Sequence, residues 1–252
     1  MKIAVYTAIF GKKDKLREPL FYQRDTKIDY YLFTDNLEAT SNIYQVLYVS
    51  SRFKDITKNA RFYKILGAPE LDSYDLLIWH DGNLQLIHNS IAELANFITI
   101  GLMASFQHPI RTCIYEESIT CIRRGKDHPR KIFKQIYGYF KNGMPVQNGL
   151  FETSILVKTN NGSLKHFLSS WWTEIENKSR RDQISLAYLL WKFNLPIEII
   201  PGSREENNFS KFQSHLYQGY TVDGLIQRKH SRLNKLAFIF LIKILKFFRQ
   251  IN

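Results

Sequence analysis

A strand-like run that stops at a polar turn is the sequence feature that most limits the fold. Residues 75–79 end in Leu-Leu-Ile-Trp, which has the length and composition of a buried strand. Asp81, Gly82 and Asn83 follow, and apolar residues then alternate from Leu84. Either Asp-Gly simply turns a hairpin, or Asp81 and Asn83 offer oxygen ligands to a divalent cation. In the second case, Gly82 would let a ligand approach the backbone closely.

Strand-like runs alternate with helical patterns along the first half of the chain, and polar residues follow each run. This alternation is typical of an α/β sheet with its ligand site at the carboxyl ends of the strands. The expected strands span residues 2–10, 30–33, 44–49 and 75–79. The expected helices span residues 57–68, with Thr57 as N-cap, and 89 to about 103.

The second half is less regular. We expect an extended segment at 112–122, strands at 150–158 and 197–200, and helices at 128–140, 163–176 and 182–193. No internal repeat or low-complexity linker interrupts the sequence. We therefore predict one Rossmann-like α/β domain over residues 1–225, with a mixed, mainly parallel sheet flanked by helices, and a basic amphipathic tail over 226–252.

Composition argues against several classes of protein. No run approaches the roughly 18–20 apolar residues of a membrane span, and no signal-peptide pattern opens the chain. Cys113 and Cys121 match no zinc pattern and suit a reducing compartment, so the expected location is the cytoplasm. Seven basic residues and no acid follow Asp223 in a chain of net charge +12, which argues against a distributed nucleic-acid surface.

Polar side chains at the strand ends are candidates for ligand binding. Thr7 and Ala8 lie towards the end of the first expected strand, and Asp35 follows the second. Asp35 could accept hydrogen bonds from a ribose or a base, or it could cap its own loop. Arg61 and Lys64 lie one helical turn apart, where they could neutralise a diphosphate or face solvent.

Acidic residues in the second half are candidates for catalysis. Asp182 begins an expected helix and is either a partner of the helix dipole or the acid that contacts an acceptor hydroxyl. Glu116 and Glu117 compete for the same role from the expected extended segment. His80 should pack rather than bind a metal, because alternation turns it away from Asp81. Lone histidines, more often structural than ligating, are His108, His215 and His230.

Four motifs, taken in order, resemble one family. They are Ala-Val-Tyr-Thr-Ala-Ile-Phe-Gly at 4–11, Phe-Thr-Asp at 33–35, Ala-Arg-Phe-Tyr-Lys at 60–64 and Trp-His-Asp-Gly-Asn-Leu-Gln-Leu at 79–86. They resemble a glycosyltransferase-like family, formerly a domain of unknown function, with plant Golgi members linked to wall polysaccharides and bacterial members in surface-polysaccharide loci. The resemblance covers roughly residues 2–200.

This resemblance implies a GT-A fold, related in outline to galactosyltransferases and glycogenin, and a hexosyltransferase-like enzyme that uses a nucleotide-sugar donor. In that fold an Asp-x-Asp motif holds Mn²⁺ or Mg²⁺ on the donor diphosphate. Asp81 carries over, whereas Asn83 places an amide in the second acidic position. A distal histidine often completes the metal shell, and His215 or His230 would supply it here.

The implied mechanism is electrostatic. The metal, with Arg61 or Lys64, would stabilise the departing nucleoside diphosphate. Asp182, or Glu117 in its place, would deprotonate the acceptor or stabilise the sugar cation. The residues expected in the sugar or acceptor pocket are Gln147, Asn148, Gly149 and Gln183.

The tail from Arg232 to Asn252 interleaves apolar residues with cations at helical spacing. We expect an interfacial helix on an anionic membrane surface; packing onto the domain or onto a partner subunit is the alternative. The sequence thus predicts a peripheral enzyme on the inner face of the cytoplasmic membrane that transfers sugar to a glycan or lipid-linked acceptor in cell-surface polysaccharide biosynthesis. A non-catalytic nucleotide- or glycan-binding protein and a peripheral membrane scaffold remain as alternatives.

Overall fold

The computed structural model describes residues 1–99, 101–216 and 231–251. The chain forms two compact units, which we describe one at a time. The first comprises Met1–Gln107, Glu152–Ser169 and Pro196–Gln227, and the second comprises His108–Phe151, Ser170–Leu195 and Arg228–Asn252. The predicted boundary between residues 225 and 226 lies outside the described residues.

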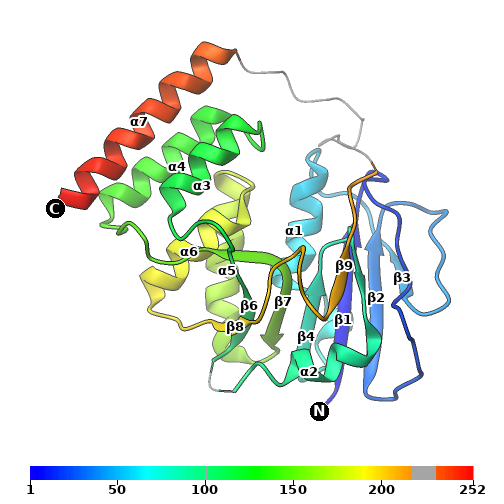
Figure 1. The fold of residues 1–252 in the computed structure, drawn as a ribbon. Helices are drawn as coiled ribbons and strands as arrows, with labels where there is room; N and C mark the ends of the chain where they lie inside the picture. The colour runs from blue at the N-terminus through cyan, green and yellow to red at the C-terminus, as the bar shows by residue number, and fades with distance from the viewer. Residues whose placement is uncertain (100, 217–230, 252) are drawn as a thin grey trace. The chain divides into compact units, whose positions relative to one another are not determined.

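A seven-stranded sheet organises the first unit, in the order β3-β2-β1-β4-β7-β6-β8 (Figure 1). β1 pairs in parallel with β2 and β4, β2 with β3, and β6 with β8, whereas β7 runs antiparallel to β4. This mixed, mainly parallel sheet confirms the predicted α/β class. The strands are β1 (Ile3–Ile9), β2 (Ile28–Thr34), β3 (Gln45–Tyr48), β4 (Leu76–His80), β6 (Met103–Gln107), β7 (Phe151–Thr159) and β8 (Glu198–Ile200).

Successive side chains of a strand point to opposite faces of the sheet, so the core of this unit lies in two parts, one on each face. Val5 and Ile78 belong to a cluster with Leu84 and Ile91, which come from the segment that follows β4. Tyr6 and Trp79 pack edge to face, with ring centroids 5.3 Å apart. The segment that follows β4 contains β5 (Leu84–Leu86), the 3-10 turn η2 (His88–Ser90) and α2 (Ile91–Ala95). Strand β5 pairs antiparallel with β9 (Ser210–Phe212).

Helix α1 (Ile56–Leu66) packs on β1. Its Tyr63 ring stacks on those of Phe10 and Phe33. The helix ends at Gly67, which has a positive φ of 74° and is followed by η1 (Pro69–Leu71). The predicted N-cap, Thr57, was wrong: Asp55 caps the helix and accepts a hydrogen bond from the Thr57 amide at 2.9 Å. A carboxylate is a strong acceptor for the unpaired amides of a first turn.

Two predicted elements were wrong. The helix expected from residue 89 to about 103 ends at Ala95, because β-branched residues and Gly101 follow and Met103 already begins β6. The segment expected to be extended at 112–122 is helix α3 (Ile114–Arg123). Its buried residues Ile114, Ser118, Ile119 and Ile122 recur at helical spacing, as on the buried face of a helix.

Helices make up most of the second unit. They are α3, α4 (Pro129–Lys141), the later part of α5 (Gly162–Asn177), α6 (Asp182–Phe193) and α7 (Arg232–Ile251). The predicted C-terminal helix is thus present, and it packs on α3 and α4. Across the described residues, we find no helix with the length and apolar character needed to cross a membrane.

Candidate functional site

The turn after β4 places one carboxylate at the carboxyl end of the central parallel strands. Asp81 is the first residue beyond β4, and its amide donates to the carbonyl of Ser154 on β7 at 2.8 Å. Its own carbonyl accepts from the Leu84 amide at 2.9 Å, which closes the turn. The Asp81 side chain is 33% exposed. A rigid backbone therefore presents a partly solvated acid at the edge where α/β sheets bind ligands.

Two donors hold the Asp81 carboxylate. Oδ1 accepts from the indole Nε1 of Trp79 at 2.9 Å and from the Lys64 ammonium at 3.3 Å. Lys64 is fully buried, so the prediction of a solvent-facing lysine is excluded. Arg61, one turn earlier on the same helix, is partly exposed. Burial therefore makes Lys64 a residue that positions Asp81, whereas Arg61 is the cation of this pair that solvent reaches.

A second buried lysine forms hydrogen bonds with the end of α1. Lys158 on β7 is fully buried, and its Nζ donates to the carbonyls of Lys64 at 2.8 Å and Ile65 at 3.0 Å. The Tyr6 hydroxyl donates to the same Lys64 carbonyl at 2.9 Å. Burial, with the nearby charge of Lys64, lowers the pKa of Lys158 to about 7. Lys158 thus helps to fix the turn of α1 from which Lys64 reaches Asp81.

Gly82 and Asn83 are fixed by close packing. A Cβ on Gly82 would lie 2.8 Å from Cγ1 of Ile9, so a side chain does not fit without movement. Asn83 is buried, and its Nδ2 donates to the Gln213 carbonyl while the Gln213 amide donates to the Asn83 carbonyl, both at 3.0 Å. The Asn83 amide group therefore joins the turn to the end of β9, a structural role that the sequence did not indicate.

His215 lies on the segment that passes this turn. Its Nδ1 contacts both oxygens of Asp14, at 2.9 and 3.0 Å. Asp14 borders Gly82, because its Cβ lies 3.6 Å from the place of a Gly82 Cβ. The Asp14 side chain is largely buried and orients the imidazole. The other candidate histidine, His230, lies outside the described residues.

The strand-end residues are more deeply buried or more fully hydrogen-bonded within the protein than the sequence suggested. Asp35 accepts from the Gly11 amide at 3.0 Å and from the Ser51 hydroxyl at 2.9 Å, so it joins its own loop to the segments that follow β1 and β3. Thr7 and Ala8 are buried inside β1. The Thr7 hydroxyl has no hydrogen-bond partner among the described residues. Their contact with a donor stays a prediction.

The donor set does not amount to a protein cage for Mn²⁺ or Mg²⁺. Within residues 1–99, 101–216 and 231–251, no group of three His, Cys, Asp or Glu side chains is placed to bind a metal. At Asp81 a buried ammonium already faces Oδ1, and the Nδ2 of Asn83 donates to the Gln213 carbonyl. The residues as placed do not fit a metal that the protein alone would hold, so the divalent cation stays a prediction.

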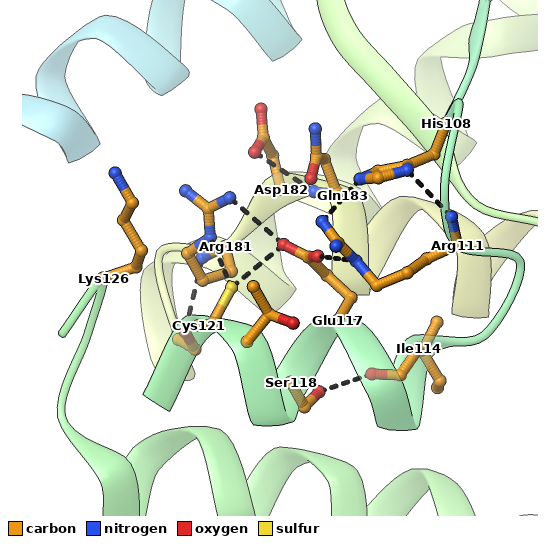
Figure 2. A network of polar contacts seen from close by, with 12 residues as sticks. His108, Arg111, Ile114, Glu117, Ser118, Cys121, Lys126, Arg181, Asp182 and Gln183 are labelled. Carbon is orange, nitrogen blue, oxygen red and sulfur yellow. Dashed lines mark hydrogen bonds and ion pairs between the residues drawn. The ribbon is translucent and has the colours of Figure 1, made fainter. Parts of the chain in front are cut away.

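Glu117 lies in a buried polar network of the second unit. Figure 2 shows its carboxylate between two guanidinium groups, with Oε2 2.8 Å from Arg111 Nε and Oε1 3.6 Å from Arg181 Nη2. Cys121 Sγ lies 3.1 Å from Oε1. Burial, with the carboxylate beside it, raises the pKa of this thiol to about 12. Taking up a proton would cost Glu117 both ion pairs, so the geometry favours a structural role over that of a base.

Asp182 is the first residue of α6, and its Oδ1 accepts from the Gln183 amide at 3.1 Å. This contact at a helix N-terminus is that of a dipole partner. Asp182 is buried and Gln183 is half-buried. Gln147 and Asn148 are exposed in the loop before β7, where Gln147 has a φ of 56° and Gly149 a φ of 85°. Catalytic or pocket roles for these residues stay predictions.

Sequence reasoning missed the residues that support the turn: Trp79, Lys158, Asp14 and Gln213. One signal was available, because Lys158 directly follows the apolar run Ile-Leu-Val in β7. A buried cation in such a run calls for partners. Asp14 and Gln213 lie in stretches of ordinary polar composition, which carry no such signal.

A mixed, mainly parallel α/β sheet with a polar turn at the end of its central strand is consistent with a GT-A-like domain. The family model described as TOD1/MUCI70, glycosyltransferase-like domain, matches residues 1–218, and the chain belongs to this family. The resemblance inferred from the four motifs is thereby confirmed. A comparison with curated proteins found no match.

Proposed function

We propose that this protein transfers a sugar from a nucleotide-sugar donor and that the donor is bound at the turn after β4. Asp81 carries the proposal: a carboxylate held by Lys64 and Trp79, yet 33% exposed, stands at the carboxyl end of the central strand. Membership of a glycosyltransferase-like family supports the reaction class.

Each group at this site has a separate task in the proposed reaction. Arg61 contacts the donor diphosphate and stabilises the charge that develops as the sugar bond breaks. Lys64 and Trp79 hold Asp81 in one orientation, in which it binds a donor hydroxyl or a cation that the diphosphate itself brings. A divalent cation, if bound with the donor, would supply further positive charge on the phosphates. His215, oriented by Asp14, lies at the edge of the same turn.

Calorimetry of the full chain against uridine, guanosine, adenosine and cytidine diphosphates, with and without Mn²⁺, tests the donor site. We expect one nucleotide to bind and Asp81→Asn to weaken that binding at least tenfold, because a carboxylate interaction worth about 1.5–3 kcal/mol is lost. Asp75→Asn is the matched control, since Asp75 is an exposed aspartate of the same unit. Absence of binding to every nucleotide, with and without Mn²⁺, would contradict the proposal.

We further propose that the acceptor is a glycan or a lipid-linked sugar at the inner face of the cytoplasmic membrane, as part of surface-polysaccharide synthesis. The cationic tail and the reaction class support this. Radiolabelled transfer from the identified donor to extracted membrane lipids tests it; incorporation only into water-soluble acceptors would contradict the lipid-linked form.

A non-catalytic nucleotide-binding protein is the second candidate. It is favoured by the amide at Asn83, which stands in the second acidic position of the motif and adds no negative charge beside Asp81. Nucleotide binding with no turnover of any nucleotide sugar, in the presence of Mn²⁺ and membrane extract, would support this candidate over a transferase.

A further inference from the structure

Helix α7 is attached to the second unit by one face. Ile239 and Ile242 are its buried residues, and Phe238 packs on Phe133 of α4 with ring centroids 5.4 Å apart. On the same side, the Lys246 ammonium bonds Glu116 of α3 at 2.5 Å. The predicted alternative of packing on the domain is therefore correct for this face, and it determines which face points away.

The opposite face of α7 is an exposed apolar stripe. Its main residues are Leu233 (80% exposed), Leu236 (52%), Phe240 (64%), Phe247 (59%) and Ile251 (61%). At 100° per residue these five positions fall within roughly 60° around the helix axis. Most of the apolar surface of the helix thus faces outward, whereas a helix that only completed a core would turn this face inward. We call these five residues the α7 stripe.

Positive charge accompanies this stripe. The second unit contains 19 of the 35 basic residues and 6 of the 23 acidic ones, which gives it a formal net charge of +13, whereas the first unit has −1. Helix α7 has no acidic residue. Arg232 and Lys243, both exposed, lie along one border of the stripe by helical spacing. Apolar and cationic groups are therefore presented together on one outward face.

We propose that the α7 stripe is the surface by which this protein docks on an anionic bilayer, with the helix lying along the membrane plane. Apolar side chains enter the acyl boundary while bordering cations meet the anionic headgroups. A second copy of the chain fits this surface poorly, because pairing two stripes would also bring together two borders of exposed cations. The proposal does not depend on the transfer reaction.

Co-sedimentation of the full chain with vesicles tests the proposal. We expect binding to phosphatidylcholine vesicles that contain about a third phosphatidylglycerol, weak binding to pure phosphatidylcholine, and release as salt rises. The double variant Phe240→Glu, Phe247→Glu should lose binding about tenfold or more, because two aromatic side chains no longer enter the bilayer.

The matched control is Leu37→Glu with Ile110→Glu, which changes the net charge equally at two exposed apolar residues outside α7 (78% and 80% exposed). It should bind vesicles within about threefold of the original chain, since its apolar changes lie off the stripe. A second variant, Arg232→Gln with Lys243→Gln, keeps the stripe and should weaken binding to anionic vesicles by about fivefold per cation. This charge variant tests the proposal if the Phe240→Glu, Phe247→Glu variant fails to fold.

Three outcomes would overturn the proposal. One is no binding of the original chain to anionic vesicles. Another is equal loss in the control and in the stripe variant. The third is a dimer in sedimentation velocity that the stripe variant dissociates, without vesicle binding by either form, which would make the stripe a subunit interface. Vesicle binding needs no donor, so its result is separate from that of the calorimetry on the donor site.

Discussion

Lys158→Met should stabilise the protein at neutral pH and flatten its response to alkali. Lys158 is fully buried, and the nearby charge of Lys64 adds to the effect of burial in lowering its pKa. Its bonds go to the carbonyls of Lys64 and Ile65, and its ammonium also lies 5.6 Å from the ring of Tyr6. Burying this cation without an acid disfavours the charged form. Methionine has a similar length and no charge.

The magnitude follows from the pKa of Lys158, lowered from 10.5 to about 7 in the fold. Between these two values the unfolded chain binds the extra proton, so stability rises with pH by about 1.4 kcal/mol per unit. Below pH 7 the full cost of burying the charge is present, and it is relieved as pH rises towards 10.5. From pH 7 to pH 9 the wild-type chain should gain about 2 kcal/mol from this group.

The variant lacks this gain, and it also lacks two hydrogen bonds worth about 1 kcal/mol each. We therefore expect Lys158→Met to be about 2 kcal/mol more stable than the wild type at pH 7 and about equal to it at pH 9. Urea unfolding followed by tryptophan fluorescence at both pH values measures this difference. Lys165→Met replaces an exposed lysine of the same unit and should follow the wild type throughout.

Parallel pH profiles for the wild type and Lys158→Met would refute this reasoning, because they would mean that Lys158 is not held as a buried, destabilised cation. A variant that is less stable at pH 7 would refute the weight given to desolvation over the two hydrogen bonds. Comparison of the two profiles removes the contribution of other groups that titrate in the same range.

Three further predictions concern packing and charge around the site. Gly82→Ala should cost about 1–3 kcal/mol of unfolding free energy, because the new Cβ meets Ile9 at 2.8 Å. The control, Gly138→Ala, lies in a helix with no atom within 4 Å of the new Cβ and should not destabilise the protein. An equal loss of stability in both variants would contradict the packing argument. Glu117→Gln should lower the melting temperature while leaving nucleotide binding unchanged; full stability with loss of transfer alone would instead make Glu117 a catalytic base. Burial lowers the pKa of His80 from 6.5 to about 4, so acid favours the unfolded chain. The free energy of unfolding should therefore fall by about 2 kcal/mol between pH 6.5 and pH 4.5. The same slope of unfolding free energy against pH in His80→Gln would exclude this cause.

Local patterns predicted most of the first unit correctly. The apolar run ending at Trp79 is β4, and the helix that bears Arg61 and Lys64 is α1, because hydrophobic periodicity is a property of neighbouring residues. The same method was wrong at 112–122. There the helical recurrence of Ile114, Ser118 and Ile122 was not recognised.

Long-range pairings could not be derived from such patterns. Lys64 reads equally well as a solvated lysine until the position of α1 beside β4 buries it. The Nδ2 of Asn83 donates to the carbonyl of Gln213, 130 residues later, and no local pattern indicates that pairing. Glu117 was expected to be a base in an extended segment, and the approach of Arg181 at the start of α6 makes it an ion-pair partner. Each result depends on where distant segments meet.

The sequence by itself determined the class of fold, the family and the turn Asp81-Gly82-Asn83, since these depend on periodicity and on the order of motifs along the chain. Tertiary structure alone decided which residues hold that turn. It placed Lys158 under α1, set Asp14 beside His215 across 201 residues, and turned the apolar stripe of α7 outward. The physical reason is that burial and pairing arise from packing, and packing brings together segments whose sequences carry no mark of one another.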